Sequence, residues 1–515
     1  MAAPPFPRPV RVEPVPLARL TAQLGVPEAA PGAVTVTGVA QSSNAVCPGD
    51  LYVALPGAHT HGARYAADAV RRGAVALLTD SAGTALLSQA PELDTLPTLV
   101  VDDPRRVAGP ISATVFGNPS QRLRVIGITG TNGKTTTAHL TDSVLRTLGS
   151  ATALLSTVHT RMGDQLLPSL RTTPEAADLQ ALLALAVERG IDTVTMEVSS
   201  HALALNRVDG TRFAVGAFTN LSVDHLDFHA DMADYFAAKA RLFDGRCEHE
   251  IVTIDDDAGR RLAKPGALTV SIRADSGAVW RATDIESAGY GQRFTLRSPY
   301  VAAMPAGIPA GIGLPGVFNV SNALLVVAIV TALGADPRQV VDALRVAPGV
   351  PGRMERVGPP ELPILAVVDY AHAPDGVAKA LAALRGVTRG RLICVLGCGG
   401  DRDTGKRPMM GAAAARGADL FVATDDNPRS ETPEEIRAAM LAGALSGTNG
   451  LSAVPKIIEI GDRAAAINYA VENAQPGDTV AVLGKGHEQG QEISGVTTPF
   501  DDRDVLAAAL REVYG

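Results

Sequence analysis

The sequence predicts an α/β protein of about three domains, and three observations support this. Continuous apolar, β-branched runs bounded by Gly alternate with helical patterns, which is typical of parallel sheets covered on both faces. The 515 residues suggest about three domains at roughly 150 residues each. Hydrophobic residues make up 46% of the chain and charged residues 19%, so the chain can bury large cores.

Eight runs are the clearest strands: residues 123–129, 193–198, 214–219, 251–254, 364–370, 391–397, 420–424 and 479–484. A helix is expected from the loop after the first run to about Leu148, and another from Pro433, where Thr432 to Glu435 match a capping box. A Pro- and Gly-rich segment at residues 348–352 indicates a boundary. We therefore expect a small α/β domain at 1–105, a larger one at 106–350, and a doubly wound one at 351–515.

Charge and cysteine content narrow the class of protein. The net charge is −8 and no run is rich in Lys or Arg, which argues against a nucleic-acid or membrane-surface partner. The four cysteines are scattered, which fits a reducing compartment. The Pro-rich N-terminus lacks the apolar core of a signal peptide, and the longest apolar run, near residues 323–333, is too short to span a bilayer. We expect a soluble, cytoplasmic protein.

The first strand runs into a glycine-rich loop, Gly130-Thr131-Asn132-Gly133-Lys134-Thr135-Thr136, and then into a helix. Glycines let backbone N–H groups turn toward a phosphate, and the helix N-terminus adds partial positive charge. Lys134 would neutralise β- and γ-phosphate oxygens, and the Thr135 hydroxyl would bind Mg2+. Only seven of the 46 basic residues are lysines, so a lysine here is expected for its own chemistry. The loop indicates ATP but does not distinguish a kinase, a GTPase and a ligase.

Acidic and histidine side chains follow the next two strands. Glu197 stands at the end of one strand, where a Mg2+ ligand is expected beside a phosphate loop. The segment at residues 224–229 holds two Asp and two His, and Lys239 follows in a helical pattern. Packing alone does not explain this density of polar side chains.

Taken together, the motifs resemble the Mur ligase family. They occur in the family's order at residues 127–135 (GITGTNGKT), 197–201 (EVSSH), 220–227 (NLSVDHLD), 319–322 (NVSN), 351–355 (PGRME) and 369–372 (DYAH). The resemblance implies three domains: a UDP-binding one, a central P-loop ATPase-like one with a parallel or mixed sheet, and a C-terminal Rossmann-like one that receives an amino acid. It also implies an ATP- and Mg2+-dependent ligase that extends a UDP-N-acetylmuramoyl peptide in peptidoglycan synthesis through an acyl phosphate.

The resemblance also implies roles in the central domain. Residues 130–136, with Lys134 at the β- and γ-phosphates, would bind ATP, and Thr135 and Glu197 would hold a first Mg2+. His225 and Lys239 would hold a second; because an ammonium cannot ligate a cation, the resemblance implies a Lys239 carbamate formed with CO2. Lys134, Glu197, His225 and Lys239 are the catalytic candidates. Asn319, Arg353 and Asp369 resemble the contacts to adenine, phosphate and ribose.

Three C-terminal segments match the branch of the family that adds the third residue of the stem peptide: residues 399–403 (GGDRD), 426–429 (DNPR) and 484–488 (GKGHE). In members that add diaminopimelate, the arginine of DNPR holds the distal carboxylate, and a guanidinium suits a carboxylate bidentately. Arg429 therefore favours meso-diaminopimelate over L-lysine, although the LL isomer presents the same carboxylate. The implied contacts are Arg402, Asp426, Asn427, Pro428, Arg429, Gly484 and Glu488.

The nucleotide-peptide side is matched by scattered positions. By resemblance, the contacts to the UDP-muramoyl dipeptide would be Ser43, His59, Thr60, Thr172, Thr173, Ser199 and Arg207. The segments at residues 49–55 and 57–62 resemble the uridine-binding module. Residues 41–44 read Gln-Ser-Ser-Asn where many members carry Asp-Ser-Arg, and Val223 replaces a commoner arginine.

Other functions stay open at this stage. A lysine-adding member would conflict with Arg429, and folylpolyglutamate synthase, which shares the fold, would lack the N-terminal module and the 484–488 segment. A catalytically inactive relative that only binds nucleotide would have lost Lys134, Glu197, His225 or Lys239. A P-loop kinase or GTPase leaves the 426–429 and 484–488 segments unexplained. We expect small-molecule substrates and a monomer.

Overall fold

The computed structural model describes residues 7–27, 34–57, 59–167, 169, 171–301, 304, 306–449 and 453–515. Part of the Pro-rich N-terminus and Ala58 of the expected uridine module lie outside these residues. The chain divides into two compact units, one of Met1–Gly130, Leu145–Phe218 and Ala237–Glu250, the other of Thr131–Val144, Thr219–Phe236 and Ile251–Gly515. Across the described ranges, no helix has the length and apolar character needed to cross a membrane.

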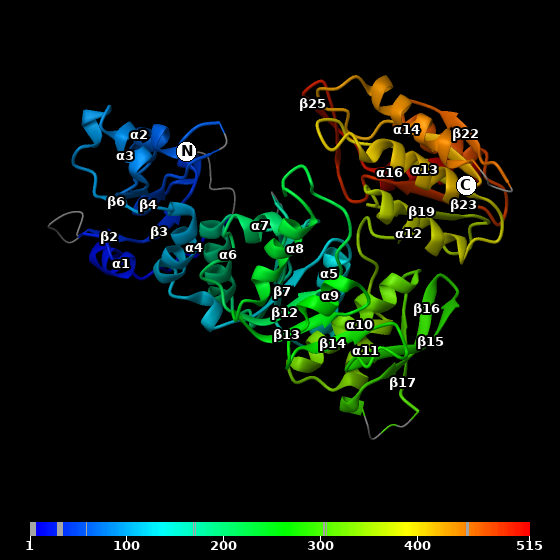
Figure 1. The fold of residues 1–515 in the computed structure, drawn as a ribbon, viewed down its shortest axis with the longest axis horizontal. Coiled ribbons are helices and arrows are strands. Elements are labelled where there is room, and N and C mark those ends of the chain that lie inside the picture. Colours follow the sequence, from blue (N-terminus) through cyan, green and yellow to red (C-terminus); the bar gives the residue numbers. More distant parts are fainter. Residues whose placement is uncertain are drawn as a thin grey trace. The chain divides into compact units, whose positions relative to one another are not determined.

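A parallel four-stranded sheet, of order β3-β4-β5-β6, opens the first unit (Figure 1). Alternate side chains of its strands enter two separate apolar clusters, one shared with α1, α4 and α6 and the other with α2. The elements are β1 (Val15–Pro16), α1 (Leu17–Leu24), β2 (Thr35–Val36), β3 (Gly38–Ala40), η1 (Ser43–Ala45), β4 (Asp50–Val53), η2 (Gly62–Tyr65), α2 (Ala66–Arg71), β5 (Ala76–Thr79), α3 (Ser81–Leu87), η3 (Pro91–Leu93), β6 (Thr98–Val100) and α4 (Pro104–Val115).

Six strands of the first unit lie in the order β10-β9-β8-β11-β7-β12 within a longer mixed sheet. Strands β8, β11, β7 and β12 are parallel, so the chain leaves β7, β11 and β12 at the same edge. The predicted runs 123–129, 193–198 and 214–219 are confirmed to within one residue at each end. The elements are η4 (Pro119–Gln121), β7 (Arg124–Thr129), β8 (Thr152–Leu155), β9 (Thr160–Met162), β10 (Gln165–Leu167), α6 (Ala176–Glu188), β11 (Thr193–Glu197), α7 (Ser200–Ala204), β12 (Phe213–Phe218) and η5 (Arg241–Phe243).

Three elements span the division between the units, and the second unit continues the chain with a further set of strands. α5 (Lys134–Thr147), α8 (Met232–Ala240) and β13 (Cys247–Thr253) are the spanning elements. β15, β16 and β17 form an antiparallel meander whose alternating burial was not anticipated from the sequence. The remaining elements here are α9 (Asp257–Leu262), β14 (Leu268–Ser271), β15 (Trp280–Ala288), β16 (Gly291–Arg297), η6 (Pro299–Val301), β17 (Ile308–Ile312), α10 (Val317–Ala332) and α11 (Pro337–Arg345).

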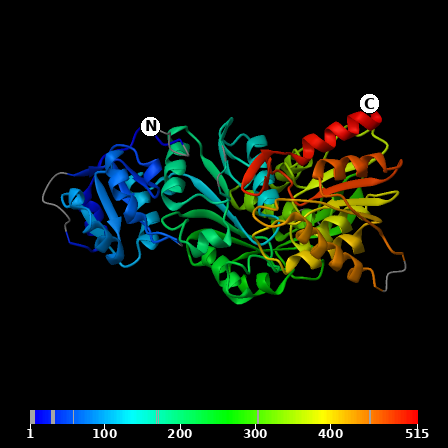
Figure 2. The same cartoon turned by 90° about the horizontal axis from the view of Figure 1, so that it is seen from above.

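The last sheet has the order β18-β19-β23-β20-β21-β22 and is parallel except for β18. Helices α15 and α16 share an apolar cluster with one face, and α12, α13 and α14 contact the strands as well (Figure 2). The doubly wound prediction is therefore confirmed. The elements are β18 (Glu355–Arg356), β19 (Leu365–Asp369), α12 (Pro374–Arg385), β20 (Leu392–Leu396), α13 (Lys406–Gly417), β21 (Leu420–Ala423), α14 (Pro433–Gly447), β22 (Lys456–Glu459), α15 (Arg463–Glu472), β23 (Thr479–Leu483), β24 (Gly490–Ile493), β25 (Val496–Pro499) and α16 (Asp502–Tyr514).

The predicted capping box at α14 is only half right. Pro433 is the first helical residue, as expected, but the Thr432 side chain makes no capping hydrogen bond. The Thr432 carbonyl instead accepts the Glu435 N–H at 3.2 Å, and Glu434 pairs with Arg437. Because Pro433 has no N–H of its own, one of the orphan donors of the first turn is already absent.

Candidate functional site

The glycine-rich loop joins β7 to α5, as the sequence predicted, with Lys134 as the first helical residue. Gly130 and Gly133 both have positive φ, 142° and 87°. A Cβ on Gly133 would lie 2.4 Å from Asn322 Oδ1 on α10, so only glycine fits there. The close packing of the loop against α10 therefore requires glycine at position 133.

Hydrogen bonds from the segment after β12 hold the loop in this conformation. Thr131 N donates to the Asn220 carbonyl at 2.8 Å, and Asn132 N donates to Asn220 Oδ1 at 3.0 Å. Asn220 Nδ2 and Thr219 Oγ1 both donate to the Asn132 carbonyl, at 3.0 and 2.6 Å. The Thr131 hydroxyl also accepts from Ser222 N at 3.0 Å. The loop is therefore pre-formed, which is what a phosphate cradle requires.

Cationic groups converge on the loop within the second unit. Lys134 Nζ donates to the Thr131 carbonyl at 2.9 Å, and Arg353 Nη2 donates to Thr135 Oγ1 at 3.1 Å. The Arg353 guanidinium stacks 4.2 Å from the centre of the Tyr370 ring. Its Nε is buried and has no hydrogen-bond partner among the described residues, so its N–H can still donate to an anionic ligand.

The segment at Asp224 and His225 places a carboxylate next to an imidazole, with His225 on strained backbone. His225 has φ 55°, and its Nε2 lies 3.6 Å from Asp224 Oδ2. Burial opposes the charged carboxylate, but His225, His372 and the His225 N–H together lower the pKa of Asp224 below its usual value. Asp224 therefore keeps its negative charge. His229, counted in the same cluster from sequence, instead pairs with Asp234 at 3.1 Å.

Glu197 and Lys239 are buried in the first unit. Glu197 ends β11, and its Oε1 accepts the Thr157 N–H at 2.8 Å. Lys239, on α8, donates from Nζ to the carbonyl of Gly130, the first loop residue, at 2.8 Å. Burying a lysine is costly unless its charge is compensated or removed, so this position suits a lysine with a chemical role.

Four of the residues expected to bind the nucleotide peptide come together in the first unit. Thr173 Oγ1 donates to the Glu197 carbonyl at 2.9 Å and accepts from Ser199 N at 3.1 Å. Thr172 accepts from the Thr157 hydroxyl at 3.1 Å. Arg207 pairs with Glu175 at 2.8 Å, while its Nε is buried with no hydrogen-bond partner among the described residues. The group has the donors that a carboxylate or diphosphate would need.

The other predicted positions on this side lie in the N-terminal part. Ser43 is buried in η1, whereas His59 and Thr60 are exposed before η2. Gln41, which departs from the family pattern, accepts the N–H of Ala177 at the start of α6 through its Oε1 at 2.9 Å. The departure therefore has a structural role of its own.

Two loops at the carboxyl edge of the last sheet bring together most of the predicted amino-acid contacts. Asn427 Nδ2 donates to Glu488 Oε2 at 2.9 Å, and Lys485 Nζ donates to Asn427 Oδ1 at 3.0 Å. Gly484 approaches the second loop so closely that a Cβ would lie 2.7 Å from Asp426 Oδ2. Burial and the neighbouring Asp426 raise the pKa of Glu488, against the opposing influence of Lys485.

Arg429 lies beside this group with its backbone fixed on both sides. It has φ 54°, its N–H donates to the Glu492 carbonyl at 2.9 Å, and its carbonyl accepts from Ser494 N at 2.6 Å. Its Nη1 donates to the Gly400 carbonyl at 2.6 Å. Pro428 is buried, and its carbonyl would lie 1.9 Å from a Cβ on Gly400. Arg402 is exposed in the loop between β20 and α13.

The predicted adenine and ribose contacts are occupied by intramolecular bonds. Asn319 Nδ2 donates to the Pro315 carbonyl at 2.8 Å, and its Oδ1 accepts from Asn322 at 3.0 Å. Asp369 accepts the N–H groups of Met354 and Ala371, at 2.7 and 2.9 Å. Burial raises the pKa of Asp369, against the opposing influence of Arg353 and these N–H groups.

Sequence reasoning missed several contributors. Tyr370 stacks on Arg353, Asn220 shapes the glycine loop, and Lys485 is fully buried between the two C-terminal loops. Lys485 had a usable signal, since it is one of only seven lysines and lies in a predicted site segment. Within the described part of the chain, no three His, Cys, Asp or Glu side chains gather as a metal site. The metal set predicted from sequence contains only two residues of these types, Glu197 and His225.

Comparisons with known proteins point in one direction along the whole chain. The description "Mur ligase family, catalytic domain" matches residues 35–112, "Mur ligase middle domain" matches residues 128–330, and "Mur ligase, glutamate ligase domain" matches residues 352–486.

Full-length relatives are similar as well. A UDP-N-acetylmuramoyl-L-alanyl-D-glutamate--2,6-diaminopimelate ligase of Streptomyces coelicolor is 51% identical over 520 residues, covering 100% of both chains. The ligase of the same name from Corynebacterium glutamicum is 46% identical over 95% of this chain and 94% of its own. A solved structure of a ligase with this name has a TM-score of 0.65 at 32% identity, over 93% of this chain and 96% of the other.

Asp178, close in sequence to the residues expected to bind the nucleotide peptide, leads to a prediction about how folding stability depends on pH. Burial raises the pKa of Asp178, near the start of α6, to about 6, with Glu175 adding to the rise and Arg8 and Arg171 opposing it. The folded protein therefore holds a proton that the unfolded chain releases near pH 4, so stability falls as pH rises from about 4 to 6. D178N should remove this penalty and stabilise the protein by roughly 2–3 kcal/mol at pH 7.

Denaturant unfolding of wild type and D178N across this pH range measures the effect. D192N is the matched control: Thr193 and Arg124 lower the pKa of Asp192 despite partial burial, so its contribution is lost as pH falls and the variant should not be stabilised at pH 7. A D178N curve parallel to that of wild type from pH 4 to 7 would rule out the assignment.

Proposed function

Because the chain belongs to the Mur ligase family, we propose that it acts as the MurE-type ligase, joining meso-2,6-diaminopimelate to UDP-N-acetylmuramoyl-L-Ala-D-Glu with cleavage of ATP to ADP and phosphate. The observation that carries the proposal is that one chain holds both a pre-formed glycine loop and the linked 426–429 and 484–488 loops. This chain is similar over its whole length to ligases of this name. Those names specify diaminopimelate without its stereoisomer.

The proposed reaction has two steps. The terminal carboxylate of the dipeptide attacks the γ-phosphorus of ATP, and ADP leaves with the electrons of the broken phosphoanhydride bond. An amine of diaminopimelate then attacks the acyl phosphate carbon, loses a proton, and expels inorganic phosphate as the amide forms. The protein's contribution is mainly to hold reactants in line and to neutralise phosphate charge.

The residues of the glycine loop are suited to the first step. Residues 130–136 would bind the phosphates, and Lys134 and Arg353 would supply positive charge there. The orphaned Arg353 Nε supports this role, because a phosphate oxygen would satisfy it. Asn319 and Asp369 would contact adenine and ribose after exchanging their present intramolecular partners for the ligand.

Members of this family depend on ATP, typically with Mg2+. We assign Thr135 and Glu197 to a first Mg2+, and His225 and a carbamylated Lys239 to a second. The donor set fits a hard cation once Lys239 carries a carboxylate, since oxygen ligands are what Mg2+ prefers. Bound Mg2+ would supply charge neutralisation at the phosphates.

The carbamate itself can be tested directly. Protein equilibrated with 13C-labelled bicarbonate should show a carbamate carbonyl resonance by NMR, because a neutral Lys239 amine adds to CO2 and releases one proton. K239R should lack this resonance, and K264R, which changes a lysine outside the proposed site, should keep it. A spectrum unchanged by K239R would assign the carbamate elsewhere, and no resonance in wild type would remove it from the proposal.

The residues assigned to diaminopimelate complement its charged groups. Arg429 would bind the distal carboxylate of diaminopimelate, and Glu488 its distal ammonium, with Arg402, Asp426, Asn427, Pro428 and Gly484 completing the site. A lysine substrate would bring an ammonium to Arg429, which repels it. On the other substrate, Ser43, His59, Thr60, Thr172, Thr173, Ser199 and Arg207 would bind the UDP-muramoyl dipeptide.

The organisation proposed from sequence is kept. Three domains, at 1–105, 106–350 and 351–515, are supported by the separate family descriptions that match residues 35–112, 128–330 and 352–486. We propose a cytoplasmic monomer acting on small-molecule substrates, in line with the nucleotide precursors it would use.

Phosphate release tests the function as a whole. With ATP, Mg2+ and UDP-N-acetylmuramoyl-L-Ala-D-Glu, we expect phosphate and a tripeptide product when meso-diaminopimelate is added, and neither with L-lysine. Running the LL isomer in parallel tests the stereochemical part of the proposal. Turnover with lysine would overturn the specificity, and silence with every amino acid would favour a relative that only binds nucleotide.

Arg429 provides the residue-level test. R429A should raise the KM for diaminopimelate by about 100-fold while leaving the KM for the UDP-dipeptide within about threefold, because a desolvated bidentate contact to a carboxylate is lost. R503A, which removes a guanidinium of α16 that pairs with the capping residue Asp501, is the control for loss of charge in the same part of the chain. Equal losses for both substrates would contradict the role given to Arg429.

A further inference from the structure

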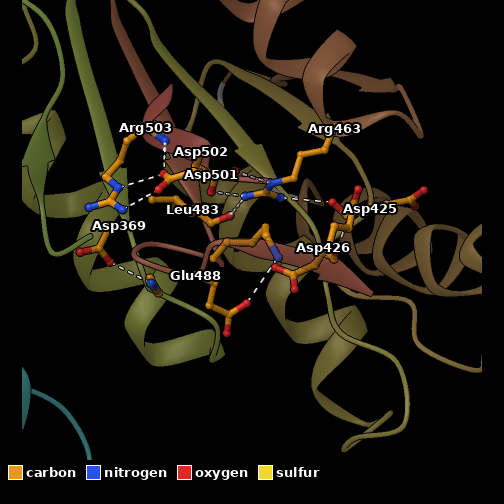
Figure 3. A network of polar contacts seen from close by, with 12 residues as sticks. Asp369, Asp425, Asp426, Arg463, Leu483, Glu488, Asp501, Asp502 and Arg503 are labelled. Carbon is orange, nitrogen blue, oxygen red and sulfur yellow. Dashed lines mark hydrogen bonds and ion pairs between the residues drawn. The ribbon is translucent and has the colours of Figure 1, made fainter. Parts of the chain in front are cut away.

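Arg463 is an arginine that the proposed reaction does not use, and its side chain is fully buried. It is the first residue of α15, where the partial positive charge of the helix end disfavours a cation. Figure 3 shows its guanidinium among Asp502, Leu483 and Asp425.

Four hydrogen bonds hold this guanidinium. Nε and Nη2 donate to Asp502 Oδ1 and Oδ2, both at 2.7 Å, in a bidentate ion pair whose carboxylate is also fully buried. Nη1 donates to the carbonyl of Asp425 at 3.2 Å, and Nη2 donates to the carbonyl of Leu483 at 3.0 Å. The planar fork is fixed in one orientation by Asp502, so its other N–H groups point at defined places.

The two carbonyls stand at the roots of the two substrate loops. Asp425 lies two residues after β21 and immediately before the 426–429 segment, and Leu483 ends β23 immediately before the 484–488 segment. One side chain therefore fixes the distance between the places where both loops begin. Since β20 lies between β21 and β23 in the sheet, no backbone ladder joins these two strands directly.

The loops leave little room for a change in this distance. A Cβ on Gly484 would already lie 2.7 Å from Asp426 Oδ2, and Asn427 links both Lys485 and Glu488 across the gap. Gln491 further ties the Asp426 carbonyl to β24 at 2.9 Å. A shift at the roots would move Asp426, Asn427 and Glu488 relative to one another.

Stability alone is a poor reason for this arrangement. A buried ion pair often contributes no more than two well-packed apolar side chains of the same volume, because both charges must be desolvated. The charge does have a further effect, since Arg463 faces the carboxylates Asp426 and Glu488, which raise its pKa together with Asp502 despite its burial.

We propose that Arg463, oriented by Asp502, is a positioning residue of the amino-acid site: it holds the roots of the 426–429 and 484–488 loops at the separation that diaminopimelate binding requires. This rests on the proposed function, which assigns those loops to the amino acid. Arg463 itself acts through the loops, and Asp502 through Arg463.

Initial-rate kinetics of R463Q against wild type test the proposal. The KM for diaminopimelate should rise at least about tenfold, since small misplacements of binding groups are costly, while the KM values for ATP and the UDP-dipeptide stay within about threefold. R463K keeps the charge without the planar fork and should recover part of the loss. D502N, which frees the fork from its anchor, should change the same KM in the same direction.

R391Q is the matched control. Arg391 donates from Nε and Nη2 to one oxygen, Oδ2, of the buried Asp478, at 3.0 and 2.7 Å, at the opposite, amino ends of β20 and β23, and its own side chain is 43% exposed. Its loss removes an arginine–aspartate ion pair from the same sheet without touching the loop roots, so the KM for diaminopimelate should not change.

The outcomes separate the two hypotheses. Absence of turnover in wild type would defeat the proposed function without bearing on the fold of the loops. Turnover in wild type with an unchanged diaminopimelate KM in R463Q, or with all three KM values raised equally, would overturn the positioning role. If R463Q does not fold, R463K and D502N are read by the same criterion.

Discussion

Backbone hydrogen bonds between the glycine loop and the segment after β12 are the interaction on which the nucleotide end of the second unit depends. Thr131 and Asn132 are paired to Asn220 before any ligand arrives, so the loop's conformational entropy has already been lost in folding. Binding a phosphate at this loop would then cost less ordering than at a loop that is disordered beforehand. Gly133 is the residue that permits the close packing against α10.

The acidic side chains around the two proposed substrate sites differ in the direction of their pKa shifts, and this difference affects how they would bind a cationic group. Asp224 stays ionised because His225 and His372 offset the cost of its burial. Glu488 has a raised pKa, because burial and Asp426 oppose its charge more strongly than Lys485 supports it. A carboxylate that is poorly solvated in the free protein gains more from an arriving ammonium than an exposed one would. Asp426 and Glu488 together would thus favour a cationic group of the substrate over water.

The sequence predicted what is encoded locally, and it failed where distant partners decide. Strands β7, β11 and β12 and the glycine loop follow from short runs and turn residues, and parallel topology alone brings the 426–429 and 484–488 loops to one edge. Nothing near Arg463 in sequence marks it, because its partners Leu483, Asp425 and Asp502 lie 20, 38 and 39 residues away. The predicted side-chain cap at Thr432 was wrong for the opposite reason, because neighbouring groups replace it. Pro433 has no N–H to be capped, and the Glu435 N–H donates to the Thr432 carbonyl instead of to its side chain.

Arg429 has a left-handed backbone conformation, which bears on why an arginine occupies this position. A left-handed conformation costs an ordinary residue roughly 1–2 kcal/mol and glycine much less. The 429 backbone is held there by Glu492 and Ser494 on either side, so glycine would satisfy the same hydrogen bonds with less strain. The conformation therefore does not account for an arginine at this position, and the guanidinium must. With Nη1 bound to the Gly400 carbonyl, Nε 3.7 Å from Glu492 Oε2 and the backbone fixed on β24, the guanidinium is confined to a narrow range of directions. The strained backbone at Arg429 thus holds a cation in a defined orientation, as the proposed discrimination between a carboxylate and an ammonium would require.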